Sequence, residues 1–187
     1  MINPNAAIDM LSNEHKLILQ VVDGLSRLAA GMCTGKTADP ALLLEAVAFM
    51  REFADQCHHA KEEDLLFPAL IAHGVPMHGC PIDALLHEHE QGRRLVREIA
   101  DGSDAYIRNE PGAAEATAKA VDKIAALYAN HIWKEDEMVF PMAQRLIPEG
   151  DRLTLYAAFQ EVEARNPPGT HERFHAFARK LGEVAQP

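Results

Sequence analysis

Apolar residues recur along most of the chain at spacings of three and four, the period of one face of an α-helix. Residues 8–25 form one such apolar stripe, and residues 47–69, 82–99 and 121–142 form three more. None of these segments shows the two-residue alternation and β-branched enrichment typical of strands. The pattern predicts an all-α protein with four long helices.

Clusters of glycine, proline and small polar residues interrupt these segments and favour turns. They lie at residues 31–40, 73–81, 101–112, 148–151 and 166–170. The breaks predict a four-helix bundle over residues 1–147 and a helical C-terminal extension over residues 148–187. In that additional C-terminal helix, Phe174, Phe177 and Leu181 are expected to pack against the bundle.

Each apolar stripe contains one histidine that should face the core: His15, His58, His89 and His131. In two stripes a glutamate follows four residues later, on the same side of the helix and about 6 Å away. These glutamates are Glu62 and Glu135. Four imidazoles and two carboxylates are therefore expected to converge in the middle of the bundle.

The heights of these side chains can be compared by using a rise of about 1.5 Å per residue. His15 lies about 23 Å before the expected end of its helix, and His58 about 26 Å after the expected start of the next. An antiparallel hairpin would bring them to one level. His89 reaches the level of His131 only if the third helix continues past Gly102.

The second and fourth helices also share an internal repeat. Residues 58–68 and 131–141 both follow the pattern HxxKE-acid-x-x-aliphatic-FP. This repeat predicts that the two helices are related by an approximate twofold axis through the site.

The four histidines and two glutamates cannot all be explained as ordinary buried polar residues of a core. Two buried carboxylates without cations cost several kcal/mol each, and no lysine or arginine occupies a core-facing position of the four stripes. Nitrogen and oxygen donors suit iron, manganese or zinc, and two carboxylates able to bridge suggest two ions. His59 points about 100° away from His58 and is a candidate for a further ligand. His87 is expected to face away from the site.

Residues next to the predicted ligands are expected to orient them or to surround them. Glu63, Glu88 and Asp136 are candidates for orienting the imidazoles, whereas Lys61 and Lys134 are expected to be solvated. Several large side chains should wall the pocket or pack in the core: Trp133, Tyr128, Phe67, Phe140, Met138 and Met142.

The segments LSNEHKLI, HHAKEEDLLFPAL, LLHEHEQGRR and NHIWKEDEMVFP resemble the hemerythrin family, specifically the bacterial HHE cation-binding domains, over residues 8–147. The resemblance implies an antiparallel up-down-up-down four-helix bundle with two iron ions, joined by an oxo or hydroxo bridge. Zinc or manganese ions could take the place of iron at such a centre. It implies Glu62 and Glu135 as bridging ligands, and the terminal ligands His15, His58, His89 and His131.

The sequence departs from the oxygen-carrying hemerythrins on the third helix. Those proteins have a His-x3-His pair there, whereas Leu85 stands four residues before His89. The site is more similar to HHE proteins linked to nitrosative or oxidative stress and iron–sulfur repair. We expect a protein that binds or senses O2, NO or iron; the alternative is an enzyme that turns over NO or peroxide.

A rival motif lies in the C-terminal extension. His171 to His175 spell HExxH, the zinc-hydrolase motif in which two histidines bind the metal. Only 12 residues follow, so the third ligand would have to be Glu183. A ferritin-like centre needs Glu-x-x-His pairs, and the one such pair here is Glu172 to His175.

Charge and composition exclude several classes of partner. The 28 acidic residues outnumber the 18 basic ones and give a formal net charge of −10, which argues against nucleic acid and anionic membranes. No apolar run approaches the roughly 20 residues of a membrane span, and the amino terminus lacks a signal pattern. We expect a cytoplasmic protein in which Cys33, Cys57 and Cys80 are reduced thiols.

Overall fold

The computed structural model describes residues 3–78 and 81–184, and its regular secondary structure is helical throughout. The all-α prediction is confirmed. The elements are α1 Ala6–Cys33, α2 Pro40–Ala48, η1 Phe49–His59, η2 Glu62–Leu66, α3 Phe67–Ala72, α4 Pro81–Ile107, α5 Ala113–Lys134, η3 Glu135–Val139, α6 Phe140–Leu146, α7 Glu149–Glu163 and α8 Thr170–Val184.

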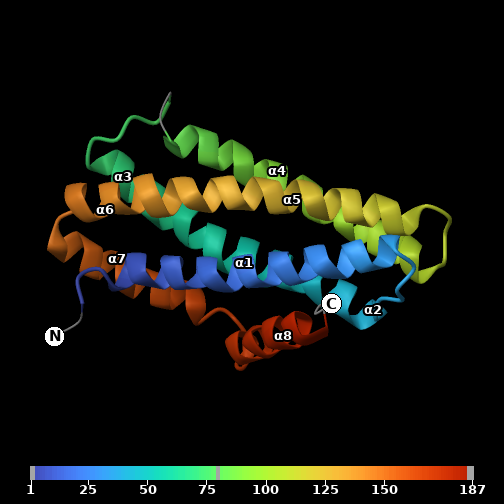
Figure 1. The fold of residues 1–187 in the computed structure, drawn as a ribbon. Helices are drawn as coiled ribbons and strands as arrows, with labels where there is room; N and C mark the ends of the chain where they lie inside the picture. The colour runs from blue at the N-terminus through green and yellow to red at the C-terminus, as the bar shows by residue number, and fades with distance from the viewer. Residues whose placement is uncertain (1–2, 79–80, 185–187) are drawn as a thin grey trace.

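Four long helical segments run side by side in Figure 1. One is α1, and residues 40–72 form the next without a break from α2 to α3. The others are α4 and residues 113–146, from α5 to α6. α1 ends near the start of α2, and the chain then returns to α3 at the end of the molecule where α6 also lies.

Both repeats contain a widened π-helical turn that the sequence analysis did not predict. The Phe67 N–H donates to the Glu62 carbonyl, and the Phe140 N–H to the Glu135 carbonyl, each five residues back. The proline after each phenylalanine has no N–H, and its ring pushes away the carbonyl four residues back. We attribute η2 and η3 to these Phe-Pro pairs. Both η2 and η3 begin at a glutamate that faces the site.

The third helix extends into residues 101–112, where the sequence predicted a break. α4 continues through Gly102 to Ile107, as the comparison of heights required for His89. Gly102 does not break the helix because it lies against α5, where an added Cβ would come within 2.6 Å of Thr117 Oγ1. The glycine allows the two helices to approach closely.

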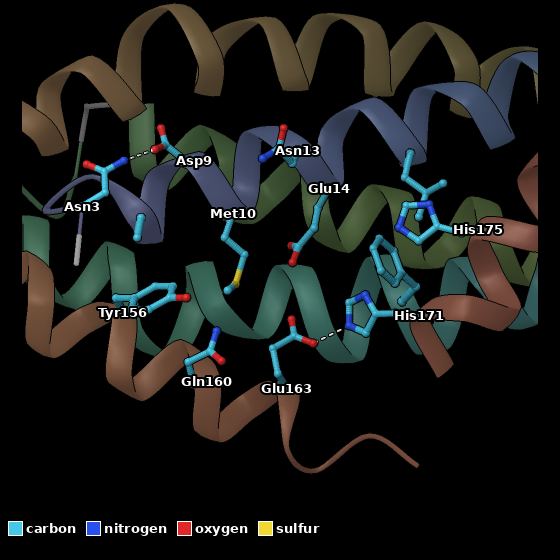
Figure 2. Close-up of a pocket in the computed structure, with 13 residues that line it drawn as sticks. Asn3, Asp9, Met10, Asn13, Glu14, Tyr156, Gln160, Glu163, His171 and His175 are labelled. Carbon is cyan, nitrogen blue, oxygen red and sulfur yellow. Dashed lines mark hydrogen bonds and ion pairs between the residues drawn. The ribbon is translucent and has the colours of Figure 1, made fainter. Parts of the chain in front are cut away.

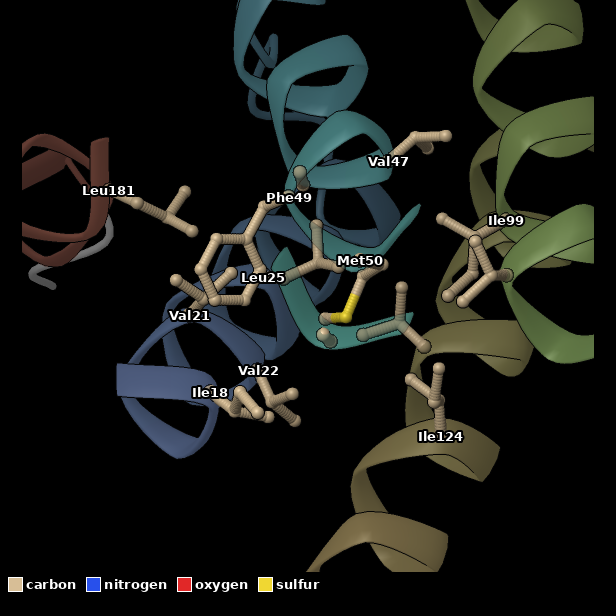
Figure 3. Close-up of a cluster of buried hydrophobic side chains, with 14 of the residues drawn as sticks. Ile18, Val21, Val22, Leu25, Val47, Phe49, Met50, Ile99, Ile124 and Leu181 are labelled. Carbon is tan, nitrogen blue, oxygen red and sulfur yellow. The ribbon is translucent and has the colours of Figure 1, made fainter. Parts of the chain in front are cut away.

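The apolar core consists of two clusters with a polar layer between them. On α1, Leu11 belongs to one cluster and Ile18 to the other, and His15 lies between them. On α4, Leu85 and Leu95 bracket the position of His89 in the same way. Figure 3 shows part of the larger cluster, which joins α1, α2, η1, α4, α5 and α8.

The C-terminal helices lie along one side of the long helices (Figure 1). Phe159 of α7 is buried in one cluster, and Phe174 and Leu181 of α8 are buried in the other. Figure 3 shows Leu181 directed toward Phe49 and Val21. Cys33 and Cys57 are free thiols, and Cys80 lies outside the described residues.

Candidate metal centre

The six predicted ligands and His59 come together in the polar layer, and all seven are buried. His15, His58, Glu62 and Glu135 each offer a ligand atom within 4.8 Å of the others, and so do His59, Glu62, His89 and His131. Glu62 belongs to both groups. Its Oε1 lies 3.6 Å from His58 Nε2, and its Oε2 lies 3.6 Å from His89 Nε2.

Glu135 also faces histidines of both groups. Its Oε2 lies 3.2 Å from His15 Nε2, and its Oε1 lies 3.3 Å from His131 Nε2 and 3.8 Å from His89 Nε2. The two carboxylates therefore stand between the two sets of imidazoles, in positions from which each can bridge two ions.

The burial of these carboxylates provides a test of whether the residues fit a metal. Both oxygens of Glu62 and of Glu135, together with His15 Nε2, are buried and lack a hydrogen-bond partner among the described residues. Buried carboxylates without partners are costly, and a cation among them would satisfy all five atoms. The donor set, nitrogen and oxygen only, fits iron, manganese or zinc.

Every imidazole that directs Nε2 toward the centre has Nδ1 against a carboxylate. The distances are 2.9 Å from His15 to Asp136, 2.8 Å from His58 to Glu14, 2.6 Å from His89 to Glu63 and 3.0 Å from His131 to Glu88. His59 Nδ1 lies 3.3 Å from Asp55. Metal-bound histidines commonly have this arrangement, which fixes the tautomer and the ring orientation.

Three of these five carboxylates were predicted from the sequence, and two were not. Glu63, Glu88 and Asp136 were candidates for orienting the imidazoles; Glu14 and Asp55 were not. Glu14 had a usable signal, because it directly precedes a predicted ligand, as Glu88 does.

The prediction that Lys61 is solvated is wrong. Its side chain is fully buried, and its ammonium group donates to Glu14 and Glu163. The reason is that α7 brings Glu163 over this face of the bundle. Lys134, the equivalent residue of the second repeat, donates to Glu88 and remains 28% exposed.

The phenylalanines of the two repeats support histidines of other helices. Phe140 stacks on His15 with a centroid distance of 5.3 Å, and Phe67 stacks on His89 at 6.0 Å. Trp133 and Met138 do not wall the site, because their side chains are 59% and 43% exposed.

The electrostatics of the metal-free centre separate its two glutamates. Burial, and then the negative charge of Glu135, raise the pKa of Glu62 well above its usual value. Burial acts on Glu135 in the same direction, but contacts with His15 and His89 outweigh it and lower its pKa. Burial and then the charge of His89 lower the pKa of His59 to about 4, which keeps this imidazole neutral and able to bind a cation.

The HExxH residues lie apart from this centre. His171 and His175 line a cavity of about 600 Å³ among α1, α7 and α8 (Figure 2), and Glu172 is exposed. Within residues 3–78 and 81–184, no group of metal-type ligands includes His175. The geometry of a two-histidine zinc site is not found there.

Comparison with protein families gives one result that covers most of the chain: residues 6–143 match the hemerythrin HHE cation binding domain. No curated protein and no solved structure matches the chain. None of the helices in the described part of the chain has the length and apolar content that a membrane crossing requires.

Proposed function

Because the chain belongs to the hemerythrin HHE cation-binding family, we propose that its polar layer holds two iron ions within an antiparallel up-down-up-down four-helix bundle. The observation that carries this proposal is the pair of ligand groups that share Glu62. A single ion would not need two groups, each complete with histidines and a carboxylate. Residues 1–147 form the bundle in this proposal, and residues 148–187 form the extension.

The two groups suggest an unequal division of ligands. One ion would be held by His15 and His58, and the other by His59, His89 and His131. Glu62 and Glu135 would bridge them. His59 would thus provide the imidazole that Leu85, at the third-helix position, cannot.

The ion held by two histidines has fewer protein ligands and is the better candidate for a small ligand such as O2 or NO. Iron at this position would supply an open coordination site and a redox couple. A narrow apolar gap lined by Ile18, Tyr128 and Ile132 borders His58, His59 and His131. The gap leaves no room for a water molecule, so a ligand that enters it would have to displace these side chains. We extend the proposal to a sensor or binding role in nitrosative or oxidative stress.

The test is reconstitution with ferrous iron under anaerobic conditions, with metal analysis and visible spectra before and after exposure to O2 and NO. About two iron ions per chain and ligand-dependent spectra are expected. A preparation that retains one ion or none would defeat the two-ion proposal. Sustained consumption of NO or peroxide would favour the enzyme instead.

Substitutions test the bridging assignment separately. Glu62→Ala and Glu135→Ala should each abolish the dinuclear centre, since each leaves two nearby cations without an intervening negative charge. His87→Ala is the matched control, because His87 is exposed on α4. Equal iron loss in all three variants would contradict the assignment of α4 residues.

A further inference from the structure

A second group of metal-type ligands lies where η1, α7 and α8 meet. Cys57, Glu163 and His171 each offer one ligand atom within 4.8 Å of the others. Cys57 Sγ lies 3.2 Å from Glu163 Oε1, and His171 Nε2 is hydrogen-bonded to the other carboxylate oxygen. None of the three belongs to the candidate metal centre of the polar layer, although Cys57 precedes His58 in the chain. That centre, formed by His15, His58, His59, Glu62, His89, His131 and Glu135, is called the His/Glu centre below.

The position of this group allows an ion to enter. Cys57 is buried with an exposed fraction of 1%, whereas the side chains of Glu163 and His171 are 18% and 38% exposed. Glu163 and His171 line the 600 Å³ cavity of Figure 2, where they face each other from α7 and α8. An ion bound by the three side chains would keep a further coordination position open toward that cavity.

The charges around the group also suit a divalent cation. Lys61 donates to both Glu14 and Glu163, so one positive charge already faces two carboxylates. With Cys57 as a thiolate, the cluster has three negative charges and one positive charge. A divalent ion brings the total to zero. Asn166 Nδ2 lies 3.3 Å from Cys57 Sγ and can donate a hydrogen bond to the thiolate.

We propose that Cys57, Glu163 and His171 bind one zinc-type divalent ion at a site separate from the His/Glu centre. Zinc accepts cysteine sulfur, histidine nitrogen and carboxylate oxygen as ligands, and it takes four ligands in a tetrahedron. Three protein ligands and one open position are the arrangement of sites that exchange water or a small ligand. The proposal does not depend on iron at the His/Glu centre.

Such an ion would join three separate elements. Cys57 lies on η1, Glu163 ends α7, and His171 lies in the first turn of α8. Binding would hold the α7–α8 connection against the bundle beside Lys61. This part of the HExxH motif thereby acquires a role that does not involve His175.

Cobalt(II) provides a direct test, because a cobalt–thiolate bond gives an intense charge-transfer absorption that the sulfur-free His/Glu centre cannot produce. We expect an intensity that corresponds to one thiolate-bound Co²⁺ per chain, and we expect excess Zn²⁺ to abolish it. Cys57→Ser should remove the absorption, and His171→Gln should weaken Co²⁺ binding at least tenfold. The double variant Cys33→Ser/Cys80→Ser, which keeps Cys57 as the remaining thiol, should retain it.

Absence of the absorption from the wild-type protein would overturn the proposal, and so would its loss in the Cys33→Ser/Cys80→Ser variant. Unchanged binding in His171→Gln would also overturn it. Circular dichroism of each variant separates loss of a ligand from loss of fold. Failure of iron to bind at the His/Glu centre would leave the cobalt–thiolate absorption unchanged, so the two proposals fail independently.

Discussion

The acidic residues next to the candidate ligands each contact a histidine of a different helix. Glu14 contacts His58, although it precedes another predicted ligand in the sequence. Glu88 likewise contacts His131 from the helix that carries His89. One position along a helix turns the side chain by about 100°, so a neighbour of an inward ligand faces the adjacent helix. Each carboxylate can accept the Nδ1 proton, which leaves Nε2 free for the centre.

Removal of the buried Lys61 ammonium should lower the free energy of unfolding far more than removal of Lys134, the equivalent residue of the second repeat. Lys61→Met leaves Glu14, which is 7% exposed, without its cation, so we expect a loss of about 3–5 kcal/mol in the free energy of unfolding. Lys134→Met breaks the matching contact with Glu88 at a partly exposed position, where a loss of about 1 kcal/mol or less is expected. Urea unfolding of both variants measures the difference. Similar losses would contradict a special role for burial at Lys61.

At the residue scale, local spacing was enough to predict the inward-facing histidines and glutamates but not their environment. The i, i+4 pairs predicted Glu62 and Glu135 because that relation is contained within one helix. The burial of Lys61 depends on Glu163, which is 102 positions away in the sequence and on another element. No local pattern contains that information.

At the element scale, the role of Gly102 could not be predicted from the sequence. Gly102 follows Asp101 in a segment rich in turn-forming residues, and the sequence therefore predicted a break there. In the structure it packs directly against α5, where an added Cβ would lie 2.6 Å from Thr117 Oγ1. The same residue type favours a turn or a close helix contact, and only the neighbouring helix distinguishes the two.

Replacement of Gly102 by alanine should destabilise the protein, although alanine has the higher helix propensity. The Cβ of a Gly102→Ala variant would lie 2.6 Å from Thr117 Oγ1 and 3.3 Å from Thr117 Cα. The helices would have to separate, at a cost of about 1–3 kcal/mol, against a propensity gain of about 1 kcal/mol. Gly150→Ala has no atom within 4 Å of the new Cβ and should not destabilise. Thermal melting compares them; a more stable Gly102→Ala variant would show that the contact is not tight.

The contact between α7 and α8 should depend on pH in the metal-free protein. Contacts with Cys57 and then Glu163 raise the pKa of His171 from 6.5 to about 10. The stabilisation by the imidazolium is therefore complete below about pH 6.5 and is lost as the pH rises through about 10. His171→Gln should reduce the free energy of unfolding by about 1 kcal/mol or less near pH 6, because the side chain is partly exposed. Urea unfolding across this range should show the difference disappear above about pH 10, and a constant difference would exclude a contribution from the charge.

At the scale of the whole molecule, one polar layer separates two apolar clusters and receives side chains from all four long helical segments. His15, His58, His89 and His131 come from one segment each. The common level of His15 and His58 was accessible from the sequence, because helix length determines it, whereas the level of His89 depended on α4 continuing past Gly102, against the predicted break. The position of the C-terminal extension was not accessible, since α7 and α8 pack through both apolar and buried charged residues.

Metal should stabilise the whole fold, and most strongly at the level of the polar layer. Without a cation, the buried carboxylate oxygens of Glu62 and Glu135 have no hydrogen-bond partners among the described residues. Each unsatisfied group costs about 1–3 kcal/mol, against a total stability of about 5–15 kcal/mol. Iron that binds the folded state and scarcely binds the unfolded chain should therefore raise Tm by mass action.

Hydrogen exchange locates this stabilisation. Removal of iron should reduce the protection of amides around His58 and His131 more than that of amides around Leu25 and Val96, which lie in the larger apolar cluster. In the metal-free polar layer, opening exposes groups that already lack partners, so it costs little free energy. Opening of the apolar cluster still exposes all of its buried apolar surface to water. Equal Tm values for the iron-loaded and iron-free protein, with unchanged exchange around His58 and His131, would contradict the assignment of these residues as ligands.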